Sequence, residues 1–445
     1  MVRVRFAPSP TGTFHIGGAR TALYNYLFAK NQNGTFILRV EDTDRIRSTP
    51  EALQTIYDSL KWLGIKWDEG PHFQSQRLTK YKEYADALLK KGIAYEREDP
   101  GKGKGIVAKI ERGLIEWDDC IHGKIGRDTT KDPDLVIIKS DGFPTYNFAC
   151  VVDDIDMKIT HVVRGDDHIP NTPKQISLYK SLDAPMPRFA HIPLIMNPDG
   201  SKMSKDYKKK GAGGKEEIIP THVLEYKKMG FLPEAFVNFI ALLGWSPGDD
   251  REVVSFDEMV RIFSLERVLN HGAQFNYEKL IWMNGSYIRQ KSLDEIIKLT
   301  MPFVAPHFDI AKIPADKLRQ AVSLEHERLK TLADLPESMK FFFSSDIEYD
   351  QKAFDKFLKK EGGKEVLEAL KTALEGCGNF DVKELEGVIE NVVAKLGVKL
   401  TKVAQPLRVA ITGSSASPPI YDTLNLLGKK IVLDRIEKTL KVLNG

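Results

Sequence analysis

The chain has 445 residues, more than one hydrophobic core usually organises, so we expect two to four domains. Its 65 basic and 62 acidic residues nearly cancel and leave a formal net charge of +3. This balance excludes a uniformly basic nucleic-acid binder, so any nucleic-acid surface must be local.

Residues 1–75 have the pattern of alternating strands and helices. The expected strands are Val2–Phe6 and Phe36–Val40, and the expected helices cover 18–30 and a stretch ending near Gly64. Ser48 and Glu51, with Pro50 between them, have the spacing of a capping box that opens the second helix. This order predicts a parallel sheet of nucleotide-binding type. The first residues contain no long apolar run, so we expect neither a signal peptide nor a membrane anchor.

Residues 76–140 interrupt this pattern with a Gly/Lys-rich turn at Asp99–Gly105 and short strand-like runs, which predicts an inserted subdomain. Residues 141–200 return to the first pattern. There we expect strands at His161–Arg164 and Ile192–Met196 and a helix from Thr172. A turn at Asn197–Gly200 then leads into Ser201-Lys202-Met203-Ser204-Lys205.

Helical patterns dominate from about residue 215 onward. Apolar stripes predict helices at 232–244, 255–270, 276–290, 293–300, 315–343, 351–376, 383–396 and 421–443. No alternating strand pattern follows residue 290, which predicts an all-helical C-terminal region.

Two widely separated motifs point to phosphate chemistry. The first strand ends in a Pro/Gly-rich turn, and His15-Ile16-Gly17-Gly18 then opens a helix. Free N–H groups and the helix dipole favour an anion there, and glycine leaves room for its approach. A lone histidine beside a turn is usually structural, but this context favours a catalytic interpretation of His15. The distant loop adds Lys202 and Lys205.

Several segments of the chain carry a family resemblance: Phe6–Gly12, His15–Arg20, Leu38–Asp44, Thr145–Phe148, Val151–Asp154, His161–Gly165, 201–205, Trp282–Gly285 and Val403–Arg408. Together they make the chain similar to class I aminoacyl-tRNA synthetases and, within them, to glutamyl-tRNA synthetases. The resemblance covers nearly the whole chain. It implies an α/β fold: a Rossmann-type parallel-sheet catalytic domain with an inserted acceptor-binding α+β subdomain, followed by an all-α C-terminal anticodon-binding region.

The resemblance also implies a division of the chain into four parts. Residues 1–75 and 141–200 would form the discontinuous catalytic domain, and 76–140 the inserted subdomain for the acceptor end of tRNA. Residues 201–289 would carry the lysine loop and a helical stem-contact domain, and 290–445 the anticodon-binding region.

The implied reaction is attack of a glutamate carboxylate on the α-phosphorus of ATP, so the site must neutralise charge and hold the two groups in line. The expected catalytic residues are His15, Lys202 and Lys205, with Lys205 meeting the leaving pyrophosphate. The expected ATP neighbours are Gly17, Gly18, Asp167, His168, Met203 and Ser204. Relatives usually have a basic residue after the lysine tetrad, where this chain has Asp206 followed by an extra Gly/Lys-rich segment, 210–215.

By the same resemblance, the expected glutamate-binding residues are Arg5, Ser9, Glu41, Tyr146 and Arg164. Two arginines that converge on one crevice are costly unless an anion lies between them, so Arg5 and Arg164 would bind the carboxylates and Glu41 the ammonium. An alternative is a structural ion pair between Arg5 and Glu41 across adjacent strands. Some relatives have an amide at the position of Cys150, which leaves the polar count of the pocket open. Asp44 is expected near the acceptor end of tRNA.

The C-terminal region offers cations that could follow a phosphate backbone, although most such side chains are solvated faces. They are Arg319, Arg328, Lys330, Lys402, Arg408, Lys429, Lys430 and Arg435. The expectation that this region binds an anticodon rests mainly on the resemblance.

The expected cofactor is ATP as substrate, with Mg²⁺ arriving on its phosphates and no metal-binding side chains of the protein. Cys120, Cys150 and Cys377 have no zinc-ligand or redox spacing, so we expect no structural zinc, reduced thiols and a cytoplasmic location. The expected partners are L-glutamate, ATP and tRNA(Glu), with tRNA(Gln) a second candidate. We expect a monomer with no membrane association.

The resemblance therefore implies a glutamate–tRNA ligase that forms glutamyl-adenylate and passes glutamate to the terminal adenosine of tRNA. The nearest alternative is a relative that attaches glutamate to a queuosine base in tRNA, against which residues 290–445 argue. A small-molecule nucleotidyltransferase is disfavoured by the arginine pair and the length of the chain. A catalytically inactive RNA-binding paralogue is disfavoured by His15, Lys202, Lys205 and Glu41.

Overall fold

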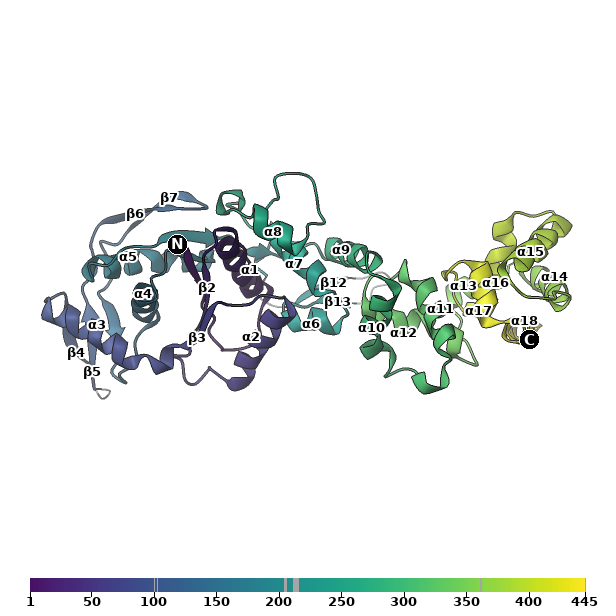
Figure 1. Cartoon of the computed structure of the whole chain (residues 1–445), viewed down its shortest axis with the longest axis horizontal. Coiled ribbons are helices and arrows are strands. Elements are labelled where there is room, and N and C mark those ends of the chain that lie inside the picture. Colours follow the sequence, from purple (N-terminus) through teal and green to yellow (C-terminus); the bar gives the residue numbers. More distant parts are fainter. Residues whose placement is uncertain (100, 102, 204–205, 211–215, 361, 445) are drawn as a thin grey trace. The chain divides into compact units, whose positions relative to one another are not determined.

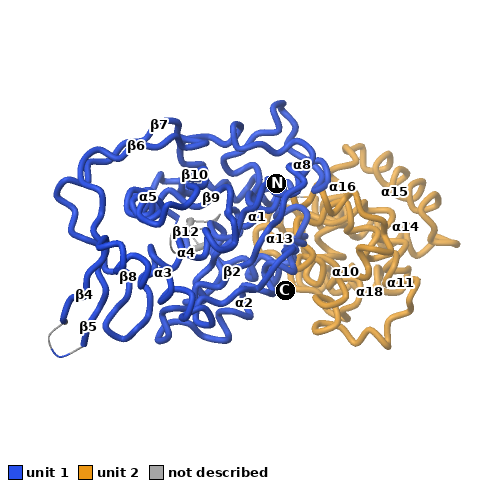
Figure 2. The backbone as a smooth tube through the Cα atoms, turned by 60° about the vertical axis from the view of Figure 1, so that its left-hand side comes forward, with its two compact units in different colours: residues 1–283 blue, residues 284–445 orange. Residues whose placement is uncertain are grey.

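The computed structural model describes the chain except residues 100, 102, 204, 205, 211–215, 361 and 445. It divides into two compact units, Met1–Met283 and Asn284–Gly445, which are blue and orange in Figure 2. The division into four parts stays a prediction, since this boundary separates only two.

Parallel strands form the centre of unit 1. One sheet has the order β1 (Arg3–Phe6), β2 (Thr35–Val40) and β3 (Glu69–Phe73). A second has the order β7 (Gly123–Asp128), β6 (Leu114–Asp119), β10 (Arg188–Ile192) and β9 (His161–Gly165). The two sheets adjoin where Thr160 donates its backbone N–H to the Arg3 carbonyl at 2.9 Å, just before β9.

Helices pack on these strands and fix the positions of the carboxyl ends of the strands. The helices of unit 1 are α1 (Ile16–Asn31), α2 (Pro50–Trp62), α3 (Leu78–Lys90), α4 (Tyr146–Asp156), α5 (Thr172–Ser181), α6 (Val223–Lys228), α7 (Pro233–Ala241) and α8 (Phe256–Ile262). The next helix, α9 (Tyr277–Arg289), spans the boundary between the units. Asn25 on α1 donates to the Val163 carbonyl of β9 at 3.0 Å, and Tyr24 donates to the Ala241 carbonyl at 2.9 Å. Helix α1 is thereby fixed between the sheet and α7.

The start of α2 corrects one prediction. Thr49, not Ser48, is the N-cap, and its hydroxyl accepts the backbone N–H of Ala52 at 3.2 Å. The proline explains the shift, because Pro50 takes the first helical position and forces the residue before it into extended backbone.

The inserted segment is built partly into the sheet that contains β9 and β10. Strands β4 (Ala94–Asp99), β5 (Gly103–Ala108) and β8 (Leu135–Ile138) form a separate antiparallel sheet. The β6–β7 hairpin instead joins the second sheet, where β6 runs parallel to β10 with Asp119 opposite Phe189. The β4–β5 and β6–β7 hairpins both lie at the left in Figures 1 and 2. Ile115 and Trp117 share a core with Phe148 and Phe189, so the insertion is packed against the parallel strands.

The chain after β10 departs from the predicted pattern. Instead of one strand over Ile192–Met196, β10 ends at Ile192 and a short β11 (Ile195–Met196) pairs with β14 (Ala273–Gln274). Pro193 lacks the N–H needed to continue the ladder. After the lysine segment an unpredicted antiparallel pair forms, β12 (Tyr207–Lys210) with β13 (Glu216–Ile219).

In the described part of unit 2, all assigned secondary structure is helical. This confirms the predicted α/β class with an all-helical C-terminal region. The helices are α10 (Leu293–Val304), α11 (Ala315–His326), α12 (Leu335–Phe343), α13 (Gln351–Phe357), α14 (Gly363–Glu375), α15 (Val382–Leu396), α16 (Leu400–Thr412), α17 (Ile420–Leu427) and α18 (Lys429–Asn444). Helix α16 was missed by the sequence patterns, because it contains Pro406 and begins without a side-chain cap. Among the described residues, no helix has the length and apolarity to cross a membrane.

Candidate active site

A cleft with a volume of about 660 Å³ lies at the carboxyl ends of β1, β2, β9 and β10. The predicted site residues that line it are Arg5, Ser9, His15, Gly17, Gly18, Glu41, Tyr146, Arg164, Asp167, His168, Lys202 and Met203. Ser204 and Lys205 lie outside the described residues. The cleft therefore gathers nearly all of the predicted residues into one site, although their roles stay predictions.

Asp44 is not among the residues that line the cleft. It lies in the loop after β2, where its carboxylate accepts from the Arg47 side chain at 2.7 Å and from the Arg47 backbone N–H at 3.2 Å. The contact of Asp44 with the acceptor end of tRNA therefore stays a prediction.

The N-terminus of α1 opens into the cleft. His15 is the N-cap residue, and the first turn carries neither an acidic residue nor a side-chain cap. A Cβ at Gly17 would meet no described protein atom within 4 Å, and Gly17 lines the cleft. The N–H groups of Gly17 and Gly18 and the positive end of the helix dipole are thus available to a phosphate.

Backbone bonds fasten this helix end to the chain that follows the lysine segment. Ile16 donates to the Thr221 carbonyl at 2.9 Å, and Val223 donates to the Phe14 carbonyl at 3.0 Å. One Asp206 carboxylate oxygen accepts both the N–H of Thr221 at 2.8 Å and its hydroxyl at 3.0 Å. Asp206, the unusual residue after the lysine tetrad, therefore anchors the segment that follows β13 beside α1.

The imidazole of His15 lies edge-on to that of His222, with ring centroids 4.6 Å apart. Burial and then the neighbouring His222 lower the pKa of His15, while Asp206 acts in the opposite direction. His15 is therefore neutral at pH 7 and can donate one hydrogen bond to a phosphate oxygen.

A buried ion network lies under the opposite end of the cleft. Arg5 donates from Nε to Asp154 Oδ1 at 3.1 Å, and Arg39 donates from Nη1 to the same oxygen at 2.6 Å. Arg39 also donates from Nη2 to Glu41 Oε1 at 3.2 Å. The alternative prediction of an Arg5–Glu41 ion pair is therefore wrong, because Arg39 is the partner of Glu41 and Asp154 that of Arg5.

Arg5 keeps part of its guanidinium for a ligand. Its Nε and Nη2 contact Asp154, and Nη2 also lies 3.6 Å from the Cys150 thiol, whereas Nη1 has no partner among the described residues. Burial, the largest effect, lowers the pKa of Arg5, but Asp154 and Cys150 together raise it above its ordinary value. Burial and then Asp154 raise the pKa of Cys150 to about 12, so this residue is a neutral thiol.

Arg164 has a different environment, because all of its partners are neutral. It donates from Nη1 to Gln175 at 2.7 Å, from Nη2 to the Thr172 hydroxyl at 2.8 Å and from Nε to His191 at 3.2 Å. The side chain is buried and lines the cleft. A buried guanidinium without a carboxylate partner favours an anionic ligand.

Tyr146 and His168 contact each other, with the Tyr146 hydroxyl 3.0 Å from His168 Nδ1. Burial, followed by the charge of Arg164, lowers the pKa of His168 to about 4. His168 is therefore neutral, and its contact with Tyr146 links a residue predicted to bind the nucleotide to one predicted to bind glutamate.

The sequence patterns missed three residues that shape this site, Arg20, Arg39 and Asp154. Arg39 carried a usable signal, because it lies in β2 two residues before Glu41, and side chains two residues apart in an extended segment point to the same side. Arg20 lines the cleft and donates to the carbonyls of Pro193 and Leu243, a backbone role that no spacing rule indicates.

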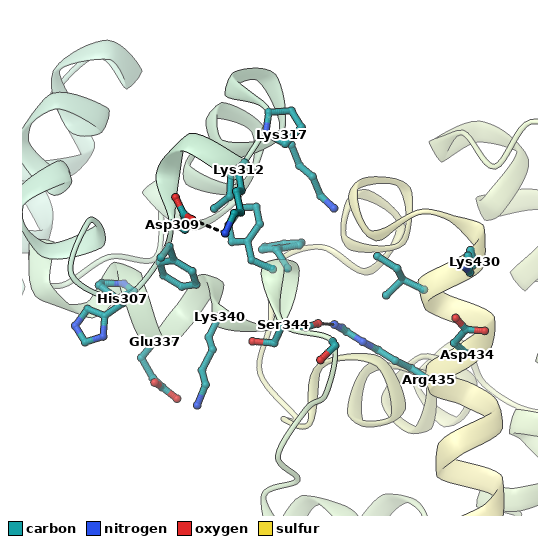
Figure 3. A pocket seen from close by; sticks show the side chains of 18 of the residues that line it. His307, Asp309, Lys312, Lys317, Glu337, Lys340, Ser344, Lys430, Asp434 and Arg435 are labelled. Carbon is teal, nitrogen blue, oxygen red and sulfur yellow. Dashed lines mark hydrogen bonds and ion pairs between the residues drawn. The ribbon is translucent and has the colours of Figure 1, made fainter.

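A second and larger cleft, of about 1170 Å³, lies in unit 2 between the 307–345 segment and α18. Figure 3 shows Lys312, Lys317, Lys340 and Lys430 around it, with Lys312 paired to Asp309 at 2.8 Å. Arg435 is only 2% exposed and donates to the carbonyls of Phe341 and Ser344 at 2.7 and 2.8 Å.

These contacts correct part of the predicted set of phosphate-following cations. Arg435 is committed to backbone carbonyls at the end of α12, Lys429 to the Glu375 and Cys377 carbonyls, and Arg408 to the Pro418 carbonyl. Lys429 and Arg435 satisfy carbonyls at the C-terminal ends of helices, which lack intrahelical partners, and Arg408 joins α16 to the segment just before α17.

The parallel sheet, the helix N-terminus open to phosphate and the lysine segment define the catalytic domain of a class I aminoacyl-tRNA synthetase. The family model of the class I tRNA synthetases (E and Q), catalytic domain, matches residues 1–102 and 96–282, and that of an anticodon binding domain matches residues 295–440.

Curated relatives specify the family further. The chain is 40% identical over 475 aligned residues to a glutamate–tRNA ligase of Syntrophobacter fumaroxidans, covering 100% of this chain and 98% of the relative. It is likewise 40% identical over 480 residues to that of Francisella tularensis subsp. novicida, covering 100% of both. A crystal structure of a glutamate tRNA ligase from Elizabethkingia meningosepticum in complex with its amino acid has a TM-score of 0.87 at 32% identity, covering 99% of both chains. The chain belongs to the glutamate–tRNA ligase family, which confirms the predicted family and ligase class.

Proposed function

We propose that the cleft of unit 1 activates L-glutamate with ATP and then transfers the glutamyl group to the 3′ terminal adenosine of tRNA. The observation that carries this proposal is the convergence of Arg5, Arg164, Glu41 and the N-terminus of α1 on one cleft. Cationic groups for carboxylates and an anion-binding helix end line the same cleft, as a reaction between a carboxylate and a phosphate requires.

In this proposal Arg164 and the unpartnered Nη1 of Arg5 bind the carboxylates of glutamate, and Glu41 binds its ammonium. Ser9 and Tyr146 complete the pocket. The attacking carboxylate is already ionised at pH 7, so no general base is needed in the first step.

The phosphates of ATP lie against Gly17 and Gly18, with His15 donating to a phosphate oxygen. Asp167, His168, Met203 and Ser204 surround the nucleotide. Lys202 and Lys205 stabilise charge on the leaving pyrophosphate. In this proposal Mg²⁺ arrives on the phosphates of ATP and is held by phosphate and water oxygens.

The second step uses the 2′-hydroxyl of the terminal adenosine, and we expect bound tRNA to be needed for activation. The inserted segment would hold the acceptor end, and the helical unit the anticodon. We further propose that the enzyme is a cytoplasmic monomer, and that tRNA(Glu) is its substrate with tRNA(Gln) as a second candidate.

Glutamate-dependent ATP–pyrophosphate exchange with and without tRNA tests this function. Exchange followed by charging of purified tRNA(Glu) supports it. Exchange without tRNA charging would favour the queuosine-base modifier instead. Absence of exchange under both conditions contradicts the proposal. Charging assays on separate tRNA(Glu) and tRNA(Gln) then decide the range of tRNA substrates.

A further inference from the structure

A buried histidine and aspartate stand behind Arg164. The Nε2 atom of His191 accepts from Arg164 Nε at 3.2 Å and from the Thr172 hydroxyl at 3.0 Å, and its Nδ1 atom lies 2.6 Å from Asp119 Oδ2. The other carboxylate oxygen, Asp119 Oδ1, accepts the backbone N–H groups of Ile121, His122 and His191 at 2.9, 3.1 and 3.2 Å. All three side chains are at most 4% exposed.

This arrangement determines the tautomer of His191. The Asp119 carboxylate can only accept, so the proton lies on Nδ1 and leaves Nε2 as an acceptor facing the guanidinium. Burial lowers the pKa of His191 and so does the charge of Arg164, although Asp119 opposes them. The imidazole is therefore neutral, and it separates the charged carboxylate of Asp119 from Arg164.

The two arginines of the cleft are thus held in opposite ways. Asp154 contacts Arg5 directly and neutralises it, whereas Arg164 meets only neutral acceptors. A carboxylate in place of His191 would orient Arg164 equally well, but it would also compete with any anionic ligand. An imidazole orients the guanidinium without supplying a counter-ion.

We propose that His191, fixed by Asp119, is a positioning residue that aims Arg164 at the cleft and leaves its charge to be matched by a substrate carboxylate. The inference rests on the proposed function and assigns the carboxylate selectivity of that site to a pair outside the cleft lining. Asp119 ends β6, so the orientation of Arg164 also depends on the inserted hairpin.

Two substitutions at residue 191 separate this role from simple packing. His191→Asn keeps a donor at the Nδ1 position for Asp119 but loses the acceptor for Arg164. His191→Gln places an amide oxygen near the Nε2 position and keeps that acceptor. Asp119→Asn is isosteric, but its amide would face Nδ1 and shift the imidazole proton to Nε2, where it opposes the N–H of Arg164.

The test measures KM for glutamate and for ATP in pyrophosphate exchange with tRNA present, and the Kd of L-glutamate alone by calorimetry. We expect His191→Asn and Asp119→Asn to raise KM and Kd for glutamate by about tenfold or more, with KM for ATP within about twofold. His191→Gln should stay within about threefold of the unaltered protein. His122→Asn is the matched control, because His122 pairs with Asp166 at 2.9 Å from the same hairpin without touching Arg164.

Equal losses in His191→Asn and His191→Gln, or a parallel rise of KM for ATP, would overturn the inference and indicate a structural role. Circular dichroism of each variant identifies a folding defect. If the variants at residue 191 fail to fold, the glutamate affinity of the isosteric Asp119→Asn variant tests the inference instead. An unaltered protein without glutamate-dependent exchange contradicts the proposed function itself. Normal exchange with glutamate affinity unchanged in His191→Asn and Asp119→Asn contradicts only the role of His191.

Discussion

Arg39 and Asp154 form a fully buried ion pair, with Arg39 Nη1 2.6 Å from Asp154 Oδ1 and the arginine 0% exposed. The same guanidinium reaches Glu41, while Asp154 also binds Arg5. One arginine outside the cleft lining thus sets the positions of two charges that face the cleft.

Arg39→Met should destabilise unit 1 by about 3–5 kcal/mol, because it leaves Asp154 and Glu41 buried with less compensation. Urea unfolding followed by tryptophan fluorescence measures this, since all five tryptophans lie before Asn284.

Arg112→Met provides the control for that variant. Arg112 pairs with Asp134 at 2.7 Å on the surface, so its loss should change stability by only about 0–1 kcal/mol. Equal effects of the two substitutions would show that the buried network does not stabilise the fold.

The sequence predicted residues whose positions follow from local element boundaries, and it missed contacts that depend on how elements pack together. Strand ends and helix starts fix which residues face a shared edge, so the sequence pattern placed His15 and Arg164 at this crevice, and the family resemblance added Glu41. The sequence could not predict that Asp154, on α4, takes Arg5 as its partner, since that pairing depends on how a helix packs over two strands. It likewise missed the β12–β13 pair, whose strands are rich in lysine and glutamate and show no apolar alternation.

L-Glutamine should be a poor substrate. Its amide cannot neutralise Arg164, and part of a buried guanidinium would stay unpaired, which disfavours it by roughly 2–4 kcal/mol. We expect kcat/KM for glutamine in pyrophosphate exchange to be at least about 30-fold below that for glutamate. Comparable values for the two amino acids would contradict the role of the arginines.

Asp206→Ala should raise KM for ATP by about tenfold, because it removes both hydrogen bonds that anchor Thr221 beside the N-terminus of α1. KM for glutamate should change little. Asp206→Asn retains an acceptor oxygen and should restore most of the ATP affinity. An Asp206→Ala enzyme with normal ATP affinity would show that this anchor does not support the phosphate site.

Lys205→Ala should slow pyrophosphate exchange by at least ~10²-fold, because it removes a cation from the developing charge of the leaving group. Lys205 lies outside the described residues, so this prediction rests on the family resemblance. Lys208→Ala is the control, since Lys208 belongs to β12 and is not among the residues lining the cleft. Near-normal turnover of the Lys205 variant, with an unchanged circular dichroism spectrum, refutes its assigned role.

Glu325 should make the stability of unit 2 depend on pH. It lies on α11 and is 2% exposed; Arg328 Nη1 is 3.9 Å from its carboxylate, and Ser338 on α12 faces it. Burial raises the pKa of Glu325 to about 7, and Arg328 only partly offsets it. Below the ordinary glutamate pKa the residue is protonated in both folded and unfolded chains, so it has no effect there.

As pH rises from about 4.5 to about 7, the unfolded chain loses this proton first, so the folded state is progressively destabilised, by about 3 kcal/mol in total. Glu325→Gln removes this penalty. The variant should match the unaltered protein at pH 4 and exceed its stability at pH 8, in urea unfolding followed by the helical circular dichroism signal. Glu327→Gln changes an exposed carboxylate two residues away and should stay within about 0.5 kcal/mol at every pH. If Glu325→Gln is instead less stable at pH 8, the ionised carboxylate is well paired in the folded state, and burial does not dominate its titration.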